Sequence, residues 1–179
     1  MEIINVSQIG TVYWLTGLSG AGKTTIGTLL YKHLKKSKTN VVYLDGDALR
    51  EVFGGQHGHS LEERKQLAMQ YSRLCRMLSN QGMYVICATI SMFHEVRNWN
   101  REHIENYIEV YIKVPMEELI RRDQKQLYSR ALKGEINHVM GINAEIEEPE
   151  KPDIVLVNDG NYSPQEIVNE LIKKLRINK

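Results

Sequence analysis

A glycine-rich segment at residues 17–24, GLSGAGKT, constrains the fold of this chain more than any other part of it. It matches the pattern G-x-x-x-x-G-K-[ST], in which the glycines let backbone N–H groups converge on phosphate oxygens without Cβ clashes. The pattern carries weight where a strand precedes it and a helix follows it. Residues 11–16 (TVYWLT) are typical of a short apolar strand. Helical spacing of apolar residues begins near Lys23 and continues through Ile26, Leu29, Leu30 and Leu34.

The segment is therefore predicted to be a phosphate-binding loop that holds MgATP. Lys23 is expected to reach the β- and γ-phosphates, and the Thr24 hydroxyl is expected to ligate Mg²⁺. The N-terminus of the following helix adds a positive dipole end. The alternative, a glycine-rich turn before a purely structural helix, is disfavoured because strand, motif and helix agree. The predicted ATP-binding residues of the loop are Gly17, Leu18, Ser19, Gly20, Ala21, Gly22, Lys23, Thr24 and Thr25.

Strands alternate with helices along the rest of the chain. Further strands are predicted at residues 41–44, 83–88, 107–114 and 153–157. Helices are predicted from the capping pair Ser60 and Glu63 to Gly82, around residues 95–105, from Pro115 onward, and from Ser163 and Pro164 onward. This alternation predicts an α/β fold with a parallel sheet covered on both faces. A length of 179 residues fits one domain, residues 1–179.

Composition narrows the class of protein. Lys and Arg total 23 against 22 Asp and Glu, so net charge does not indicate a nucleic-acid polymer as partner. Cys75 and Cys87 lack metal-ligand spacing and are expected to be buried free thiols, as in a reducing compartment. No apolar run approaches the ~20 residues of a membrane span, so a cytoplasmic protein without a membrane partner is expected.

Two carboxylates follow the second strand at Asp45-Gly46-Asp47. In open α/β sheets, ligands bind at the carboxyl ends of the strands. One carboxylate is expected to hold Mg²⁺, directly or through water, and the other to accept a proton from an acceptor hydroxyl. An ordinary Asp-Gly turn is the alternative, and the neighbouring phosphate loop favours the functional interpretation.

Residues 122–152 fit the alternating scheme least. The segment is long, polar and flanked by proline, and it is expected to form a functional lid with few apolar anchors.

Several further motifs, in order and in register, resemble the adenylyl-sulfate (APS) kinase family from residue 12 to about residue 159. The matching patterns are GLSGxGK[ST]T at 17–25, DGD-x-x-R at 45–50, I-S-x-F at 90–93, R-D-x-K-x-L-Y at 122–128, A-x-x-G-E-I at 131–136, and Gly141-Ile142 followed by Glu148-Pro149-Glu150.

The resemblance implies a P-loop kinase fold with a five-stranded parallel sheet in the order 2-3-1-4-5, helices on both faces and a lid over ATP. It also implies a homodimer that phosphorylates the ribose 3′-hydroxyl of a small nucleotide, with Mg²⁺ and ATP as the co-substrate. Asp47 is then the base, Lys125 stabilises the transferring phosphoryl group, and Arg122 meets ATP. Ser91 matches a serine reported in the family as a phosphoserine intermediate, although direct in-line transfer needs no covalent step.

With Asp47 as the base, Thr24 and Asp45 are the expected ligands of Mg²⁺. The resemblance also implies which residues bind the acceptor. Arg50 and Arg64 are implied to contact the phosphate end of the acceptor. The implied acceptor-binding residues are Asp45, Asp47, Arg50, His59, Arg64, Ile90, Ser91, Phe93, Lys125, Val139, Gly141 and Ile142.

The chain departs from the family in the acceptor half. The two phenylalanines that sandwich the acceptor adenine correspond to His59 and Val139, and a polar asparagine corresponds to Leu67. A proline and an arginine after Ser91 are replaced by Met92 and His94. Losing an aromatic face removes stacking of about 1–3 kcal/mol per base. The ATP-binding half of the site therefore matches the family pattern, while several residues of the acceptor-binding half differ from it.

The sequence leaves the acceptor open. Adenylyl sulfate is the family's acceptor, and a relative of the family phosphorylates cytidine diphosphoramidate in capsule phosphoramidate synthesis. That compound or another 5′-modified nucleotide is the alternative. Two further functions are less well supported. A regulatory P-loop ATPase would need a switch glutamine or an arginine finger, and the sequence shows neither. A silent binding domain is disfavoured by the intact Lys23, Thr24, Asp45 and Asp47.

Overall fold

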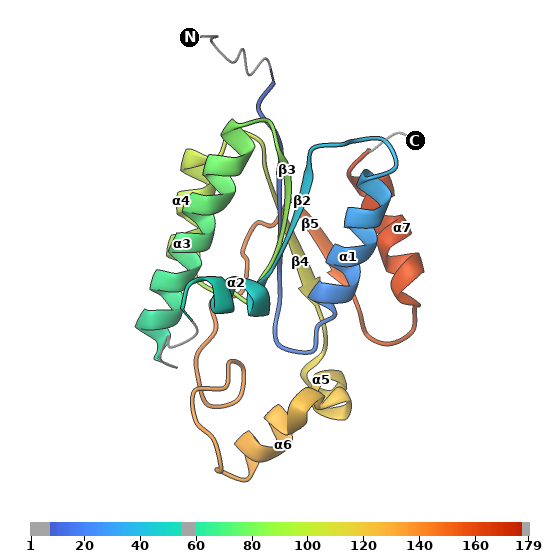
Figure 1. The fold of residues 1–179 in the computed structure, drawn as a ribbon. Coiled ribbons are helices and arrows are strands. Elements are labelled where there is room, and N and C mark those ends of the chain that lie inside the picture. The colour runs from blue at the N-terminus through green and yellow to red at the C-terminus, as the bar shows by residue number, and fades with distance from the viewer. Residues whose placement is uncertain (1–7, 55–59, 177–179) are drawn as a thin grey trace.

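A twisted parallel sheet forms the centre of the molecule (Figure 1). The computed structural model describes residues 8–54 and 60–176. The strands are β1 (Val12–Thr16), β2 (Val41–Asp45), β3 (Tyr84–Ala88), β4 (Tyr107–Lys113) and β5 (Ile154–Val157). Their order is β2-β3-β1-β4-β5 and every neighbouring pair is parallel. The predicted fold class and strand order are therefore confirmed.

Helices cover both faces of this sheet. Helices α1 (Lys23–Leu34) and α7 (Pro164–Lys174) lie on one face, and α3 (Leu61–Asn80) and α4 (His94–His103) lie on the other (Figure 1). Every residue of β1 is buried, including Trp14, because helices pack against both of its sides. Cys75 and Cys87 are buried free thiols, as predicted. Among the described residues, no helix is long and apolar enough to cross a lipid bilayer.

The helix ends lie close to where the sequence predicts them, but the structure corrects two predictions. Ser60 and Glu63 form the predicted capping box at the start of α3. Pro115 precedes α5 (Met116–Arg122) as its N-cap instead of being its first residue, because its backbone is extended. Helix α2 (Gly46–Val52) was not predicted, since seven residues are too short to show a helical period. Asp45 caps it by accepting a hydrogen bond from the Asp47 N–H at 3.0 Å.

The segment at residues 122–152 lies across the carboxyl ends of the strands (Figure 1). It contains a short 3₁₀ turn, η1 (Gln124–Gln126), and helix α6 (Leu127–Leu132). The expectation of few apolar anchors is wrong, because the structure buries Tyr128, Ala131, Val139 and Met140 from this segment. These four residues are spread over short turns and a six-residue helix, so they form no long periodic pattern that the sequence could reveal. Whether the segment moves as a lid stays a prediction.

Candidate active site

The glycine-rich loop between β1 and α1 wraps around the Lys23 side chain. Lys23 Nζ donates hydrogen bonds to the carbonyl oxygens of Gly17 at 2.9 Å and Leu18 at 2.8 Å. Gly22 caps α1 with a left-handed backbone at φ 94°, which glycine adopts without strain. A Cβ atom at Gly22 would lie 2.8 Å from Asn158 Nδ2, so the loop tolerates no side chain there.

The electrostatic state of Lys23 follows from this enclosure. Burial lowers the pKa of the Lys23 ammonium to about 8, while the charges of Asp45 and Asp47 act in the opposite direction. The carbonyl oxygens of the loop are weak partners for a cation compared with phosphate oxygens. The ammonium therefore sits where phosphate oxygens would give it stronger hydrogen bonds than the loop does.

The two residues predicted to hold Mg²⁺ lie together. Thr24, in the first turn of α1, donates from Oγ1 to Asp45 Oδ2 at 2.8 Å. The Tyr43 hydroxyl donates to the same carboxylate oxygen at 3.1 Å. Hydroxyl and carboxylate oxygens are suitable ligands for Mg²⁺, which is usually bound by one or two protein groups together with phosphates. The residues present fit such an ion.

Asp47 and Lys125, predicted from separate motifs, also meet. Lys125 Nζ lies 3.5 Å from one oxygen of the Asp47 carboxylate, and Arg50 Nη1 lies 3.7 Å from the other. The Asp47 side chain is 71% exposed, so an acceptor hydroxyl has access to it. Lys125 has a left-handed backbone with φ 60° between Asp123 and Gln126, which also have positive φ. Such backbone is uncommon outside glycine and is concentrated at functional sites.

A cavity of about 510 Å³ joins these groups. The predicted site residues that line it are Ser19, Gly20, Gly22, Lys23, Thr24, Thr25, Asp45, Asp47, Arg50, Arg64, Ile90, Ser91, Phe93, Lys125 and Val139. The predicted site residues that do not line this cavity are Gly17, Leu18, Ala21, Arg122, Gly141 and Ile142. The prediction for His59 lies outside the described residues. One cavity thus unites most of the residues taken from separate motifs.

Arg122 lines a second, smaller cavity of about 290 Å³, which shares Gly20, Gly22 and Thr25 of the loop with the larger one. Its guanidinium donates to the carbonyl oxygens of Gly20 at 3.2 Å and Asn158 at 2.9 Å, and its Nε donates to Glu118 at 2.7 Å. Arg122 therefore lies beside the phosphate loop, and its contact with ATP stays a prediction. Asn158 was missed, although it directly follows β5 at the carboxyl edge of the sheet, where the general rule for α/β sheets places ligands.

Other lining residues were missed for a different reason. Tyr71 lies in the helix predicted from Ser60 to Gly82 and His138 lies in the 122–152 segment, but neither was among the predicted site residues. Both line the larger cavity. Helical spacing shows which face of a helix is apolar but not whether that face meets a core or a cavity. The lining residues without a sequence prediction include Ala68, Tyr71, Leu127, Ile136, Asn137, His138 and Met140.

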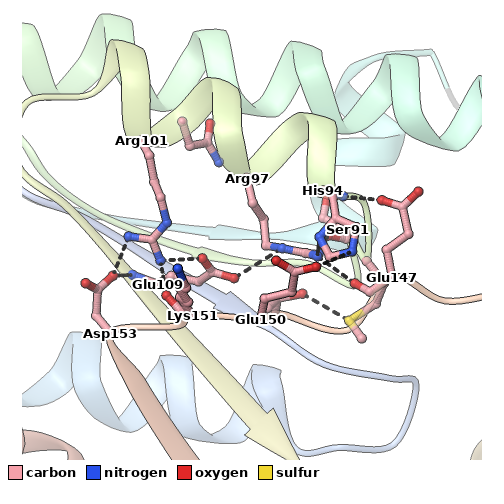
Figure 2. A network of polar contacts seen from close by, with 12 residues as sticks. Ser91, His94, Arg97, Arg101, Glu109, Glu147, Glu150, Lys151 and Asp153 are labelled. Atoms are coloured by element: carbon pink, nitrogen blue, oxygen red, sulfur yellow. Dashed lines mark hydrogen bonds and ion pairs between the residues drawn. The ribbon is translucent and has the colours of Figure 1, made fainter.

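Arg97 and Glu109 form the buried centre of a network of polar contacts that joins α4, β4 and residues 147–153 (Figure 2). Arg97 of α4 and Glu109 of β4 are each 3% exposed, and Arg97 Nε lies 3.3 Å from Glu109 Oε1. Arg101 Nη2 lies 2.7 Å from Glu109 Oε2 and also donates to the Lys151 carbonyl oxygen at 2.8 Å. Asp153 accepts from the Glu109 N–H at 2.7 Å and from Arg101 at 3.3 Å. The network thereby ties the end of the 122–152 segment to the sheet.

The same arginine holds the segment around Ser91. Arg97 donates to the carbonyl oxygens of Ser91 at 3.4 Å and Glu147 at 2.6 Å, and its Nη2 lies 2.8 Å from His94 Nδ1 (Figure 2). Ser91 is buried with φ 35°, a conformation that needs support from its surroundings. Arg97 therefore fixes one wall of the cavity without lining it.

Replacing Arg97 with methionine should lower the free energy of unfolding by about 3 kcal/mol, because it leaves the buried Glu109 with one cationic partner. Burial already raises the pKa of the Glu109 carboxyl against the opposing charges of Arg97 and Arg101. Urea denaturation measures the loss. Lys65→Met is the matched control, since the ion pair of Lys65 with Glu95 lies on the surface and should contribute less than about 1 kcal/mol. Equal small losses for both variants would contradict the interpretation.

Comparison with protein families gives a match to the adenylylsulphate kinase model over residues 9–157. The cytidine diphosphoramidate kinase of Campylobacter jejuni is 45% identical over 166 residues, covering 93% of this chain and 96% of the relative. A probable adenylyl-sulfate kinase of Archaeoglobus fulgidus is 41% identical over 150 residues, covering 84% of this chain and 97% of that protein.

A solved structure agrees with the sequence comparisons. The Mycobacterium tuberculosis APS kinase in complex with AMPPNP and APS superposes with a TM-score of 0.85 at 32% identity. The match covers 94% of this chain and 99% of that chain. Both the fold and the family resemblance drawn from the motifs are thus confirmed.

Proposed function

This chain belongs to the adenylylsulphate kinase family, and we propose that it transfers the γ-phosphate of MgATP to the ribose 3′-hydroxyl of a nucleotide whose 5′-phosphate carries a further group. One observation carries the proposal. The phosphate loop with Lys23, the Thr24–Asp45 pair and the Asp47–Lys125 pair all line one cavity. The cavity of about 510 Å³ is within the range of small-molecule sites.

The ATP side of the cavity supplies positioning and charge. Lys23 would exchange the Gly17 and Leu18 carbonyl oxygens for phosphate oxygens when ATP binds. Thr24 and Asp45 would hold Mg²⁺, which neutralises charge on the phosphate chain when it is bound. Arg122, fixed by Gly20 and Asn158, would lie against the nucleotide.

The acceptor side supplies the proton acceptor. Asp47 would take the proton of the 3′-hydroxyl as its oxygen forms a bond to the γ-phosphorus and the bond from that phosphorus to the leaving ADP oxygen breaks. Lys125 would move with the 122–152 segment from the Asp47 carboxylate to the transferring phosphoryl group. No covalent enzyme intermediate is required, so Ser91 acts in this proposal as a wall of the acceptor pocket.

Cytidine diphosphoramidate is the proposed acceptor. Val139 lines the cavity and is 6% exposed at the position where the family has a stacking phenylalanine, so the pocket lacks that aromatic face. A smaller pyrimidine loses less from this change than adenine does. The similarity to a cytidine diphosphoramidate kinase over almost the full length of both chains supports the same choice.

Adenylyl sulfate is the second candidate acceptor. The observation in its favour is the similarity to adenylyl-sulfate kinases and to a structure that contains APS. The two candidates differ both in the base and in the terminal group on the 5′-phosphate. A direct comparison of rates therefore separates them.

A panel of acceptors tests the proposal. The full chain with MgATP should release ADP when cytidine diphosphoramidate is added, and more slowly with adenylyl sulfate. Chromatography with mass detection should find one added phosphate on the 3′-oxygen of the acceptor. Turnover on adenylyl sulfate alone would select the second candidate. ADP release that no acceptor stimulates would indicate an ATPase and reject the kinase.

Four further features complete the proposal: the extent of the domain, its lid, its compartment and its oligomeric state. The chain acts as one kinase domain over residues 1–179 with residues 122–152 as its lid, in the cytoplasm and as a homodimer by analogy with the family. Light scattering at assay concentrations measures the number of chains in the particle. A monomer with full activity would remove the dimer from the proposal.

A further inference from the structure

Tyr43 and Asp45 lie two residues apart on β2, so their side chains point to the same face of the sheet. Helix α1 packs against this strand, and the Tyr43 hydroxyl donates to Asp45 Oδ2 at 3.1 Å. The same oxygen accepts from Thr24 Oγ1 at 2.8 Å, and Asp45 Oδ1 accepts from the Asp47 N–H at 3.0 Å. Three donors thus fix the orientation of the carboxylate that the proposed function assigns to Mg²⁺.

The direction of the hydrogen bond between Tyr43 and Asp45 follows from the groups themselves. A carboxylate only accepts hydrogen bonds, whereas a neutral tyrosine hydroxyl carries one proton to donate. The Thr24 carbonyl oxygen lies 3.3 Å from the same hydroxyl, but a charged acceptor at a shorter distance forms the stronger bond. Tyr43 therefore gives its single proton to Asp45.

The packing of α1 holds the Tyr43 ring in place. A Cβ atom at Gly27 would lie 2.7 Å from Tyr43 Cε2, so the helix approaches the ring at a residue that has no side chain. The Tyr31 ring, on the same helix, lies 6.3 Å from the Tyr43 ring between centroids. A hydroxyl on a ring that is held by packing is a fixed donor, and such partners orient the carboxylates that bind metals.

Tyr43 differs from the other two donors to Asp45. Thr24 is itself expected to bind Mg²⁺, and the Asp47 N–H belongs to the backbone at the start of α2. Among the described residues, those that line the larger cavity include Thr24 and Asp45 but not Tyr43. The Tyr43 hydroxyl therefore acts through Asp45 and not on a bound nucleotide.

We propose that Tyr43 is a positioning residue whose hydroxyl holds the Asp45 carboxylate in the orientation that binds Mg²⁺ together with Thr24. This inference rests on the proposed function, which assigns Mg²⁺ to Thr24 and Asp45. It adds a residue that lies outside every motif of the sequence. Without the Tyr43 hydroxyl, the carboxylate keeps only the donors from Thr24 and the Asp47 backbone.

Tyr43→Phe tests the inference, because it keeps the ring and removes only the hydroxyl. Calorimetry on the full chain without acceptor measures the affinity for MgATP and, with a chelator present, the affinity for ATP without metal. Affinity for MgATP should fall about tenfold, the lower end of the usual loss when a partner of a metal ligand is removed. Affinity for metal-free ATP should not change, and its binding also shows that the variant is folded.

Tyr31→Phe is the matched control. Tyr31 lies beside Tyr43, but its hydroxyl is not among the donors to Asp45 in the described part of the chain, so both affinities should stay unchanged. A purely structural role of the Tyr43 hydroxyl would lower the affinities for both forms of ATP equally. That result, or an unchanged MgATP affinity in Tyr43→Phe, would overturn the inference.

The failure of this inference and the failure of the proposed function are distinguishable. If the unmodified protein prefers MgATP to metal-free ATP but no acceptor stimulates ADP release, the kinase proposal fails and Tyr43→Phe still decides the inference. If the unmodified protein binds both forms of ATP equally, Asp45 holds no metal and the inference fails. If an acceptor is phosphorylated and Tyr43→Phe binds MgATP as the unmodified protein does, the inference alone fails.

Discussion

Replacing Lys23 with alanine should reduce turnover by about 10³-fold or more while the protein remains folded. The Lys23 ammonium makes its hydrogen bonds to the backbone carbonyl oxygens of Gly17 and Leu18, so it does not hold the core together. In the proposed function Lys23 lies beside the phosphates and stabilises the charge that develops during phosphoryl transfer. The loss should therefore appear in the rate of the chemical step.

Single-turnover ADP formation with saturating MgATP and acceptor measures this loss. Lys32→Ala is the matched control, because Lys32 lies on the exposed side of the same helix and should keep full activity. A Tm for Lys23→Ala close to that of the unmodified protein would exclude unfolding as the cause. Near-normal ADP formation by the folded Lys23→Ala protein would remove the phosphate loop from the mechanism.

The backbone of the ATP half could be predicted from the sequence because local rules determine it. The glycines of the loop, the strand before it and the helix after it are all specified within about 25 residues of sequence. The meeting of Thr24 and Asp45 at 2.8 Å was expected from the general position of ligands at the carboxyl ends of parallel strands. The strand order came from the resemblance to a family, since alternation alone predicts a parallel sheet but not its order.

The remaining features depend on contacts between distant parts of the chain. Arg97 and Glu109 resemble solvated charges in their own elements, and only the packing of α4 on β4 buries them together. Tyr71 shares a helical stripe with core residues, and its unpaired hydroxyl is visible only once the cavity is known. Helix α2 is set by a cap at Asp45 that side-chain periodicity does not reveal. The cavity wall on the proposed acceptor side is thus the part of the site that local sequence rules describe least.

Replacing Asp47 with asparagine should slow the chemical step by about 10²–10⁴-fold, the usual contribution of a general base. The change keeps the size of the side chain and removes its negative charge and its ability to accept a proton. MgATP affinity should be largely retained, because Thr24 pairs with Asp45 and not with Asp47. Asp47 contacts Lys125 at 3.5 Å and Arg50 at 3.7 Å, so its loss also frees two cations that face the acceptor.

Comparison with Asp45→Asn shows which of the two carboxylates is the base and which binds the metal. Asp45 is expected to hold Mg²⁺ with Thr24, so this variant should lose MgATP affinity together with rate. Titration of MgATP and single-turnover rates measured on both variants separate the roles. If Asp47→Asn loses MgATP affinity as strongly as it loses rate, Asp47 is a ligand of the metal. If its rate is unchanged, Asp47 is neither base nor ligand, and the proton of the acceptor must pass to another group in the cavity.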